Sequence, residues 1–242
     1  MFSRIKKILL DLLSIILIVL PSEIKIPIYR WVFGYKIGNH VKIGLSWIRV
    51  GKLEIGDYVS IGHFNRFKNI PEIQIGEHTG IGTGNTFTST FEFTNPEGML
   101  VRGNQPVLEV GKHCGIGMLH YFDVQDRFTI GSFTVVAGIG SVFFTHYLDV
   151  VNSTQSTKPI SIGEYCMIGS SVRFVPGANV ANCCVIGMAS VVTKSFPETH
   201  ILIGGNPAQV IRKLPGDAAF FSRSVGWIGS FSPSPFASVD NK

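Results

Sequence analysis

The side chain best suited to acid–base chemistry is His146, in the segment THYLD at residues 145–149. Imidazole titrates near neutral pH, so a positioned histidine can take a proton from an attacking group. Among the seven histidines, His146 is singled out because a regular repeat ends there and a polar segment, residues 147–159, begins. The alternative interpretation is a surface histidine beside a turn.

A histidine that acts as a base needs a partner on its other ring nitrogen, and three aspartates are candidates. Asp149 is close to His146 in the sequence, and Asp123 and Asp126 lie in HYFDVQDRFTIG at residues 120–131. We expect this segment to lie about one repeat before His146 and to stack beside it. Asp126 is the favoured candidate, although each of the three acids could instead cap a turn.

The sequence does not predict a metal site. The four cysteines form no C-x-x-C pair, so a structural zinc site is not expected. We interpret them as reduced thiols of a cytosolic protein, with one of the adjacent residues Cys183 and Cys184 packed inward.

The composition predicts a well-buried globular protein, because 45% of the residues are hydrophobic and only 15% are charged. The formal net charge is +5, but no run of five or more like charges occurs. A few Lys and Arg residues that bind a phosphorylated cofactor explain this surplus as well as nucleic acid would, and we expect no nucleic-acid partner.

The element that positions these residues is a six-residue repeat. An aliphatic or aromatic residue recurs at every sixth position, often followed by a small residue, a spacing that neither a helix nor a flat strand produces. The members are Ile37, Ile43, Ile55, Ile61, Ile75, Ile81, Val110, Ile116, Ile130, Val136, Val142, Ile162, Ile168, Phe174, Val180, Ile186 and Val192. The pattern predicts a solenoid in which each hexad is a short strand and a turn, and three hexads form one coil of a triangular prism.

Two segments interrupt the repeat, residues 87–106 and residues 147–159. Solenoids accept insertions as loops on one face, and such loops often carry function. We expect three parts: residues 1–34 as an apolar helical segment, residues 35–214 as the solenoid domain, and residues 215–242 as a tail. A short helix is expected near the end of the solenoid, before a loosely held tail that could cover a neighbour.

The repeat resembles that of the hexapeptide-repeat acyltransferases from about residue 35 to residue 214. The most specific parts are VIGMASVVTKSF at residues 185–196 and GGNPAQVIRKL at residues 204–214. Together with THYLD, they look most like the sugar O-acetyltransferases of the maltose, galactoside and surface-polysaccharide branch. The resemblance implies an all-β, left-handed parallel β-helix, acetyl-CoA as cosubstrate, and a homotrimer with active sites between adjacent prisms.

The resemblance also implies roles for single residues. The histidine of the T-H-x-x-D element, here His146, takes the proton of the acceptor hydroxyl. The positions that match the cofactor site are Ser170, Met188, Thr193, Lys194 and Arg212. Lys194 and Arg212 suit the nucleotide phosphates, although both could be solvated surface residues. Met188 departs from the small residue usual at its position, which leaves the shape of the cofactor groove open.

A related β-helix family, the gamma carbonic anhydrases, binds zinc through an H-x-x-x-x-H element and a third histidine. No two histidines are five residues apart in this chain. We therefore expect no metal.

The N-terminal segment allows three interpretations. Residues 8–20 are apolar except for Asp11 and Ser14, too few to span a bilayer as a helix, and Arg4, Lys6 and Lys7 precede them. The helix could pack on its own domain or on a neighbouring subunit, lie at the inner face of the cytoplasmic membrane, or belong to a secreted or spanning protein. We expect a cytoplasmic location.

The function that the resemblance implies is O-acetylation of a sugar hydroxyl in a surface polysaccharide or its precursor, by direct attack in a ternary complex. No serine or cysteine nucleophile motif is visible, which agrees with direct attack. Two alternatives remain open at this point. One is an N-acyltransferase of a nucleotide-linked amino sugar, and the other is a non-catalytic solenoid that binds a partner or glycan.

Overall fold

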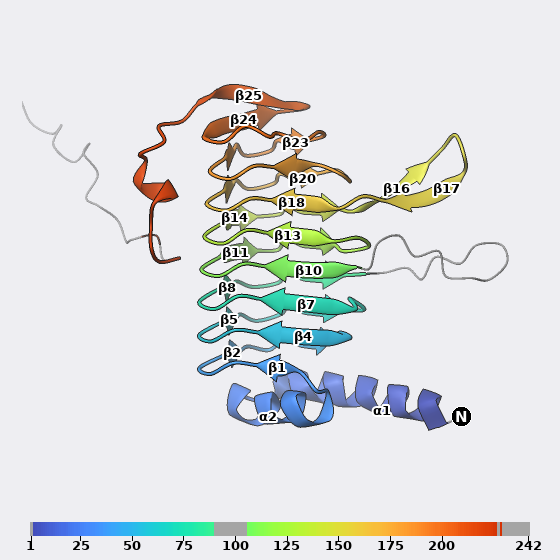
Figure 1. The fold of residues 1–242 in the computed structure, drawn as a ribbon. Helices are drawn as coiled ribbons and strands as arrows, with labels where there is room; N and C mark the ends of the chain where they lie inside the picture. Colours follow the sequence, from blue (N-terminus) through green and yellow to red (C-terminus); the bar gives the residue numbers. More distant parts are fainter. Residues whose placement is uncertain (1, 90–105, 227, 229–242) are drawn as a thin grey trace, which may run out of the picture.

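The strands of the protein form three long sheets around one interior, as the computed structural model of residues 2–89, 106–226 and 228 shows (Figure 1). Each strand pairs in parallel with the corresponding strand of the next coil. Ile37 aligns with Ile55, and Ile162 aligns with Val180, in each case three hexads further along the chain. This mostly-β arrangement of parallel sheets is consistent with a β-helix, as the six-residue spacing predicts.

The strand bounds follow the repeat. The first sheet contains β1 (Lys36–Ile37), β4 (Lys52–Ile55), β7 (Glu72–Ile75), β10 (Val107–Val110), β13 (Phe128–Ile130), β18 (Ile160–Ile162) and β21 (Asn179–Val180). The second contains β2 (Lys42–Ile43), β5 (Ser60–Ile61), β8 (Gly80–Ile81), β11 (Gly115–Met118), β14 (Val135–Ile139), β19 (Met167–Ile168), β22 (Val185–Ile186), β24 (Ile201–Gly205) and β25 (Ala208–Lys213). The third contains β3 (Trp47–Arg49), β6 (Arg66–Lys68), β9 (Thr86–Thr88), β12 (Tyr121–Asp123), β15 (Val142–Phe144), β20 (Arg173–Phe174) and β23 (Val191–Val192).

The core is a set of side-chain ladders that run along the stack. In the third sheet, consecutive phenylalanine rings stack with centroids 4.5–5.1 Å apart, and each ring is at most 1% exposed. The rings belong to Phe67, Phe87, Phe122, Phe143 and Phe174. Because each inward side chain is covered by the coils above and below it, a single coil could not bury its own face.

The inward position assigned to Val142 is wrong by one residue. Phe143 is fully buried and Val142 only half-buried. The reason lies in β14, whose register against β11 is irregular: Ile116 pairs with Val136, but Met118 pairs with Ile139. The additional residue in this coil moves the next inward position from Val142 to Phe143.

The C-terminal end of the stack differs from the expected short helix. Residues 201–213 form an antiparallel hairpin of β24 and β25, and β24 extends the second sheet by pairing in parallel with β22. Beyond it, the described residues contain one helical turn, η2 (Ala219–Phe221). Arg223 then packs against the chain's own coils, where its backbone carbonyl accepts a hydrogen bond from the Tyr165 hydroxyl at 3.2 Å. Residues 227 and 229–242, most of the expected loose tail, lie outside the described residues.

The N-terminal end is closed by α1 (Phe2–Ile16), a 3-10 turn η1 (Leu17–Val19) and α2 (Ser22–Val32), which lie across the end of the stack below β1 (Figure 1). The expected helical segment is therefore two helices. In the part of the chain that the structure describes, neither is long and apolar enough to cross a bilayer.

The cysteines are unpaired thiols. Cys184 is buried and Cys183 is half-buried, as predicted for this adjacent pair.

Removing one ring from the phenylalanine ladder should destabilise the protein strongly. Phe122→Ala leaves a cavity between stacked coils, so we expect a loss of about 3–5 kcal/mol in the free energy of unfolding. Phe144→Ala, at a residue that is 41% exposed, is the matched control and should cost about 1 kcal/mol or less. Urea unfolding followed by circular dichroism measures both; equal losses would contradict the ladder as the main source of stability.

A buried histidine should make stability depend on pH. His120 is 1% exposed, its Nδ1 accepts a hydrogen bond from the Ser141 N–H at 3.0 Å, and burial lowers its pKa to about 4. Because the unfolded chain, with its histidine pKa near 6.5, binds the proton more readily, stability is complete above pH 6.5 and falls as the pH drops towards 4.

Between pH 7.5 and pH 5, we expect His120 to account for a loss of about 2 kcal/mol. His120→Asn should remove this part of the pH dependence, whereas the exposed His63→Asn should keep it. Unfolding measured at both pH values tests this. An unchanged pH dependence in His120→Asn would show that the ring is not held neutral.

Candidate functional site

His146 lies at the edge of the third sheet where the chain leaves the coil after β15. It begins a two-stranded hairpin of β16 (His146–Asp149) and β17 (Thr154–Thr157), in which His146 is opposite Thr157. The segment predicted as the interruption at residues 147–159 is largely this hairpin, which projects from the side of the stack (Figure 1). The His146 side chain is 25% exposed.

The aspartate that contacts His146 is Asp123, at the end of β12. Its Oδ2 lies 2.8 Å from His146 Nδ1, and its side chain is fully buried. The same oxygen accepts hydrogen bonds from the backbone N–H of Thr145 at 3.1 Å and from the Thr145 hydroxyl at 3.2 Å. The other oxygen, Oδ1, has no hydrogen-bond partner among the residues that the structure describes. These contacts fix the carboxylate and, through it, the orientation of the imidazole ring.

The other two candidate aspartates, Asp126 and Asp149, have other contacts. Asp126 is buried, accepts a hydrogen bond from the Thr157 hydroxyl at 3.0 Å, and so ties β17 to the coil. Asp149 accepts hydrogen bonds from the Val151 N–H at 3.0 Å and from the Asn152 side chain at 2.8 Å, which lower its pKa and hold the hairpin turn. The structure therefore brings Asp123, rather than Asp126 or Asp149, against His146.

Both interruptions of the repeat leave the stack at the edge that carries His146. The first follows β9 and ends before β10, and the second is the β16–β17 hairpin. At this edge, the Ser89 hydroxyl donates to Gln125 Oε1 at 2.9 Å. Residues 90–105, which make up most of the first interruption, lie outside the described residues.

The predicted cofactor residues fall into two groups. Thr193 and Lys194 follow β23, which lies two strands from β15 in the same sheet, so they share the edge of His146. Lys194 Nζ donates to Gln209 Oε1 on β25 at 3.0 Å, and Arg212 is exposed on the same strand. Lys194 and Arg212 thus both lie at the C-terminal end of the stack, Lys194 on the edge of His146 and Arg212 on the second sheet.

The second group lies at the opposite edge of the third sheet. Ser170 and Met188 follow β19 and β22 and precede β20 and β23. Ser170 Oγ accepts a hydrogen bond from the Ile139 N–H at 3.4 Å, and Met188 is 73% exposed. Within one chain, the width of the third sheet separates this pair from His146.

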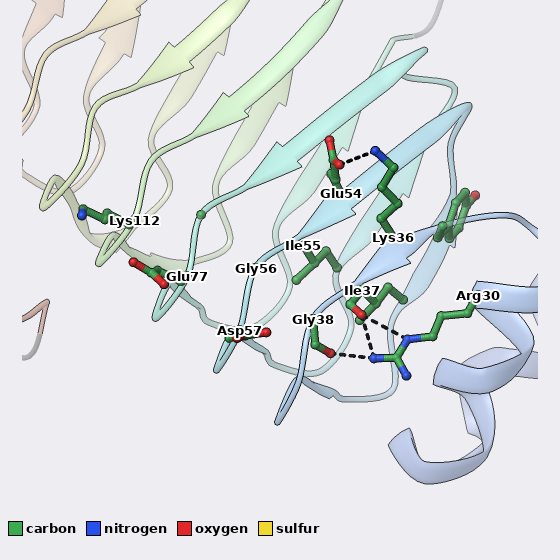
Figure 2. A pocket seen from close by; sticks show the side chains of 12 residues that line it. Arg30, Lys36, Ile37, Gly38, Glu54, Ile55, Gly56, Asp57, Glu77 and Lys112 are labelled. Carbon is green, nitrogen blue, oxygen red and sulfur yellow. Dashed lines mark hydrogen bonds and ion pairs between the residues drawn. The ribbon is translucent and has the colours of Figure 1, made fainter.

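A concavity of about 760 Å³ lies near the N-terminal end of the stack, away from His146. Figure 2 shows Arg30, Lys36 and Glu54 among the residues that line it. Lys36 pairs with Glu54 at 2.6 Å, and Arg30 donates to the backbone carbonyl of Gly38 at 2.7 Å. Arg30, Lys36 and Glu54 are thus engaged with one another or with the backbone, and the described residues that line the concavity include no histidine, so it is not the candidate site. No cluster of three potential metal ligands occurs in residues 2–89, 106–226 and 228.

Sequence comparison relates the chain to acetyltransferases, although no family model matches it. It is 34% identical over 83 residues to the protein named "Putative acetyltransferase YJL218W" of Saccharomyces cerevisiae, over 33% of this chain and 42% of that protein. It is 28% identical over 198 residues to "Putative colanic acid biosynthesis acetyltransferase WcaF" of Escherichia coli, over 77% of this chain and 76% of that protein. The chain thus spans less than half of the yeast protein that it matches.

A solved structure shares the fold. The UDP-N-acetylglucosamine acyltransferase of Campylobacter jejuni superimposes with a TM-score of 0.55 at 16% identity, over 74% of this chain and 63% of that chain. The chain is thus similar in sequence to proteins named as acetyltransferases and shares its fold with a solved acyltransferase, in agreement with the family that its repeat resembles.

Proposed function

We propose that the chain is an acetyl-CoA-dependent O-acetyltransferase that acts on a sugar hydroxyl of a surface polysaccharide or its precursor, and that its coils form a left-handed β-helix. The observation that carries this proposal is the His146–Asp123 pair, at 2.8 Å, on the edge where both interruptions of the repeat leave the stack. The name of the E. coli relative, which refers to colanic acid biosynthesis, supports a polysaccharide-related acceptor.

The chemistry follows from the geometry of the pair. Because Asp123 holds Nδ1, proton exchange with the acceptor goes through Nε2 of His146. Nε2 takes the proton of the acceptor hydroxyl as its oxygen attacks the thioester carbonyl of acetyl-CoA. The ester C–O bond forms, the C–S bond breaks, and the proton passes to the departing CoA sulfur. Asp123 keeps the ring in the required tautomer and stabilises the imidazolium in between.

The C-terminal end of the stack offers charge for the cofactor. Thr193, Lys194 and Arg212 would hold the nucleotide and phosphate end of acetyl-CoA at the C-terminal end of the stack. Ser170 and Met188 lie across the width of the third sheet, so a complete cofactor site would combine the His146 edge of one copy with the Ser170 edge of another. This division supports a homotrimer with sites between adjacent prisms.

Substitution of the base and of two candidate aspartates should separate Asp123 from Asp149. We expect His146→Ala to lower kcat about 10²- to 10⁴-fold, and Asp123→Asn to lower it about 10²-fold or more, because the amide can hold the wrong tautomer. Asp149→Asn should leave kcat within about threefold of the wild-type value, because that carboxylate only holds the hairpin turn.

Release of the CoA thiol measures this, with a panel of sugars, nucleotide sugars and oligosaccharides as acceptors, and the product is examined for an ester or an amide. Full activity of His146→Ala would remove the base from the mechanism, and an amide product would replace O-acetylation by N-acylation. Absence both of turnover and of acetyl-CoA binding would favour a binding protein.

The basic residues at the end of the stack should act on cofactor binding alone. Lys194→Ala and Arg212→Ala should each raise the KM for acetyl-CoA about fivefold to tenfold with little change in kcat, because each removes a charge that the phosphates contact equally in ground and transition states. Lys112→Ala, a lysine at the N-terminal concavity, is the control. An unchanged KM in both variants would place the cofactor elsewhere.

A further inference from the structure

Helix α1 turns its polar side chains towards the stack. Asp11 Oδ1 pairs with Arg49 Nε at 2.6 Å, and Ser14 Oγ accepts a hydrogen bond from Trp47 Nε1 at 2.9 Å. Ser14 is fully buried, as is Leu17 in the following turn. The two polar residues that interrupt the apolar run thus anchor the helix to β3.

The outer face of the same end is apolar, and we call it the base surface. Its large side chains are each about half exposed or more, from 47% for Ile5 to 88% for Trp31. They are Ile5, Ile8, Leu9, Leu12, Ile15, Ile16 and Val19 from α1 and η1, and Ile24, Trp31 and Val32 from α2. A helix on the surface of a globular protein normally has a polar outer face, with its apolar stripe towards the core alone.

The base surface is not needed to complete the fold. A buried lysine already fastens α2 to the stack: Lys25 Nζ donates to the carbonyls of Ile18 at 3.1 Å and Gly44 at 2.8 Å. The helices cover the open ends of the first coil with their inner faces, while their outer faces contact nothing among the described residues. Exposure of so many apolar side chains on one end indicates a binding surface.

The charged residues beside the base surface indicate what kind of partner it binds. Lys6 and Lys7 are exposed on α1, and Asp11 is neutralised by Arg49, so the helix presents positive charge; Glu23 is the exposed acid on α2. A second copy would bring the same lysines to the contact, whereas an anionic lipid surface is complementary to them. Lys side chains can extend from an apolar helix face to the lipid headgroups. Tryptophan, here Trp31, is a residue type enriched at the level of the headgroups.

We propose that the base surface binds an anionic lipid bilayer, with α1 lying in the headgroup region and the coils stacked away from the membrane. The binding is peripheral. Apolar side chains enter the boundary between headgroups and acyl chains, while Lys6 and Lys7 contact the phosphates.

Sedimentation of the full chain with vesicles tests this proposal. The probes are phosphatidylcholine vesicles with and without about a third phosphatidylglycerol. Wild type should bind the anionic vesicles and bind the neutral ones more weakly. Ile8→Gln/Leu12→Gln should weaken binding about tenfold or more. Lys6→Gln/Lys7→Gln should weaken binding to anionic vesicles alone, about fivefold for each lysine.

The matched control is Val150→Gln/Val151→Gln, which removes two apolar side chains, 79% and 87% exposed, at the hairpin turn. It should bind vesicles as wild type does. Circular dichroism confirms that each variant is folded, and the fluorescence of Trp31, assigned with Trp31→Phe, should shift to shorter wavelength with anionic vesicles.

Three results would overturn the proposal. The first is that folded wild type binds no vesicles. The second is that Ile8→Gln/Leu12→Gln binds vesicles as strongly as wild type does. The third is that the protein assembles without lipid and that only Ile8→Gln/Leu12→Gln loses this assembly, since a second copy would then cover the base surface. The measurement uses neither acceptor nor acetyl-CoA, so its outcome does not depend on the proposed activity.

Discussion

The constraint on which the structure depends is that no coil can bury its own inward side chains. Phe122 is covered because Phe87 and Phe143 stack on its two faces, at 4.5 and 4.6 Å. Strand positions therefore accept few changes, and additional residues can enter only where the chain turns from one sheet to the next. Both long insertions use the same edge, and the edge that they share carries His146. The site is a consequence of where a stacked core permits insertions.

Much of the fold could be predicted because the six-residue period is also the period of burial. Ile37, Ile55 and Ile162 point inward as the spacing predicts. The period failed at Val142, where the additional residue near Ile139 is invisible in the sequence because Val142 and Phe143 are both apolar. The short helix expected near the end of the solenoid is a separate miss, because residues 201–213 form a hairpin whose first strand pairs with the open edge of β22.

The position of His146 at the end of a coil could be predicted, whereas the choice of the aspartate that contacts it could not. His146 stood out because the repeat ends at it, whereas the choice among three aspartates depends on coil register. Phe144 aligns with Asp123, so the chain leaves the coil just beyond that carboxylate and His146 can turn back to it. Asp149 is nearer in sequence, but the hairpin carries it away from the coil. Nearness in the sequence is a poor guide to contact in a solenoid, because residues 23 positions apart, such as Asp123 and His146, can be in contact.

The exposed strand edges at the two ends of the stack are covered in different ways. Each end leaves strand edges that need cover, and at the C-terminal end β24 and β25 supply it with a strand whose outer side carries Gln209, Arg212 and Lys213. At the N-terminal end, α1 supplies cover and directs Asp11 and Ser14 inward, but its outer face also carries exposed leucines and isoleucines. Protection of strand edges alone would favour a polar outer face at both ends. The apolar outer face of α1 is therefore explained by contact with something outside the chain, and its lysines indicate an anionic surface.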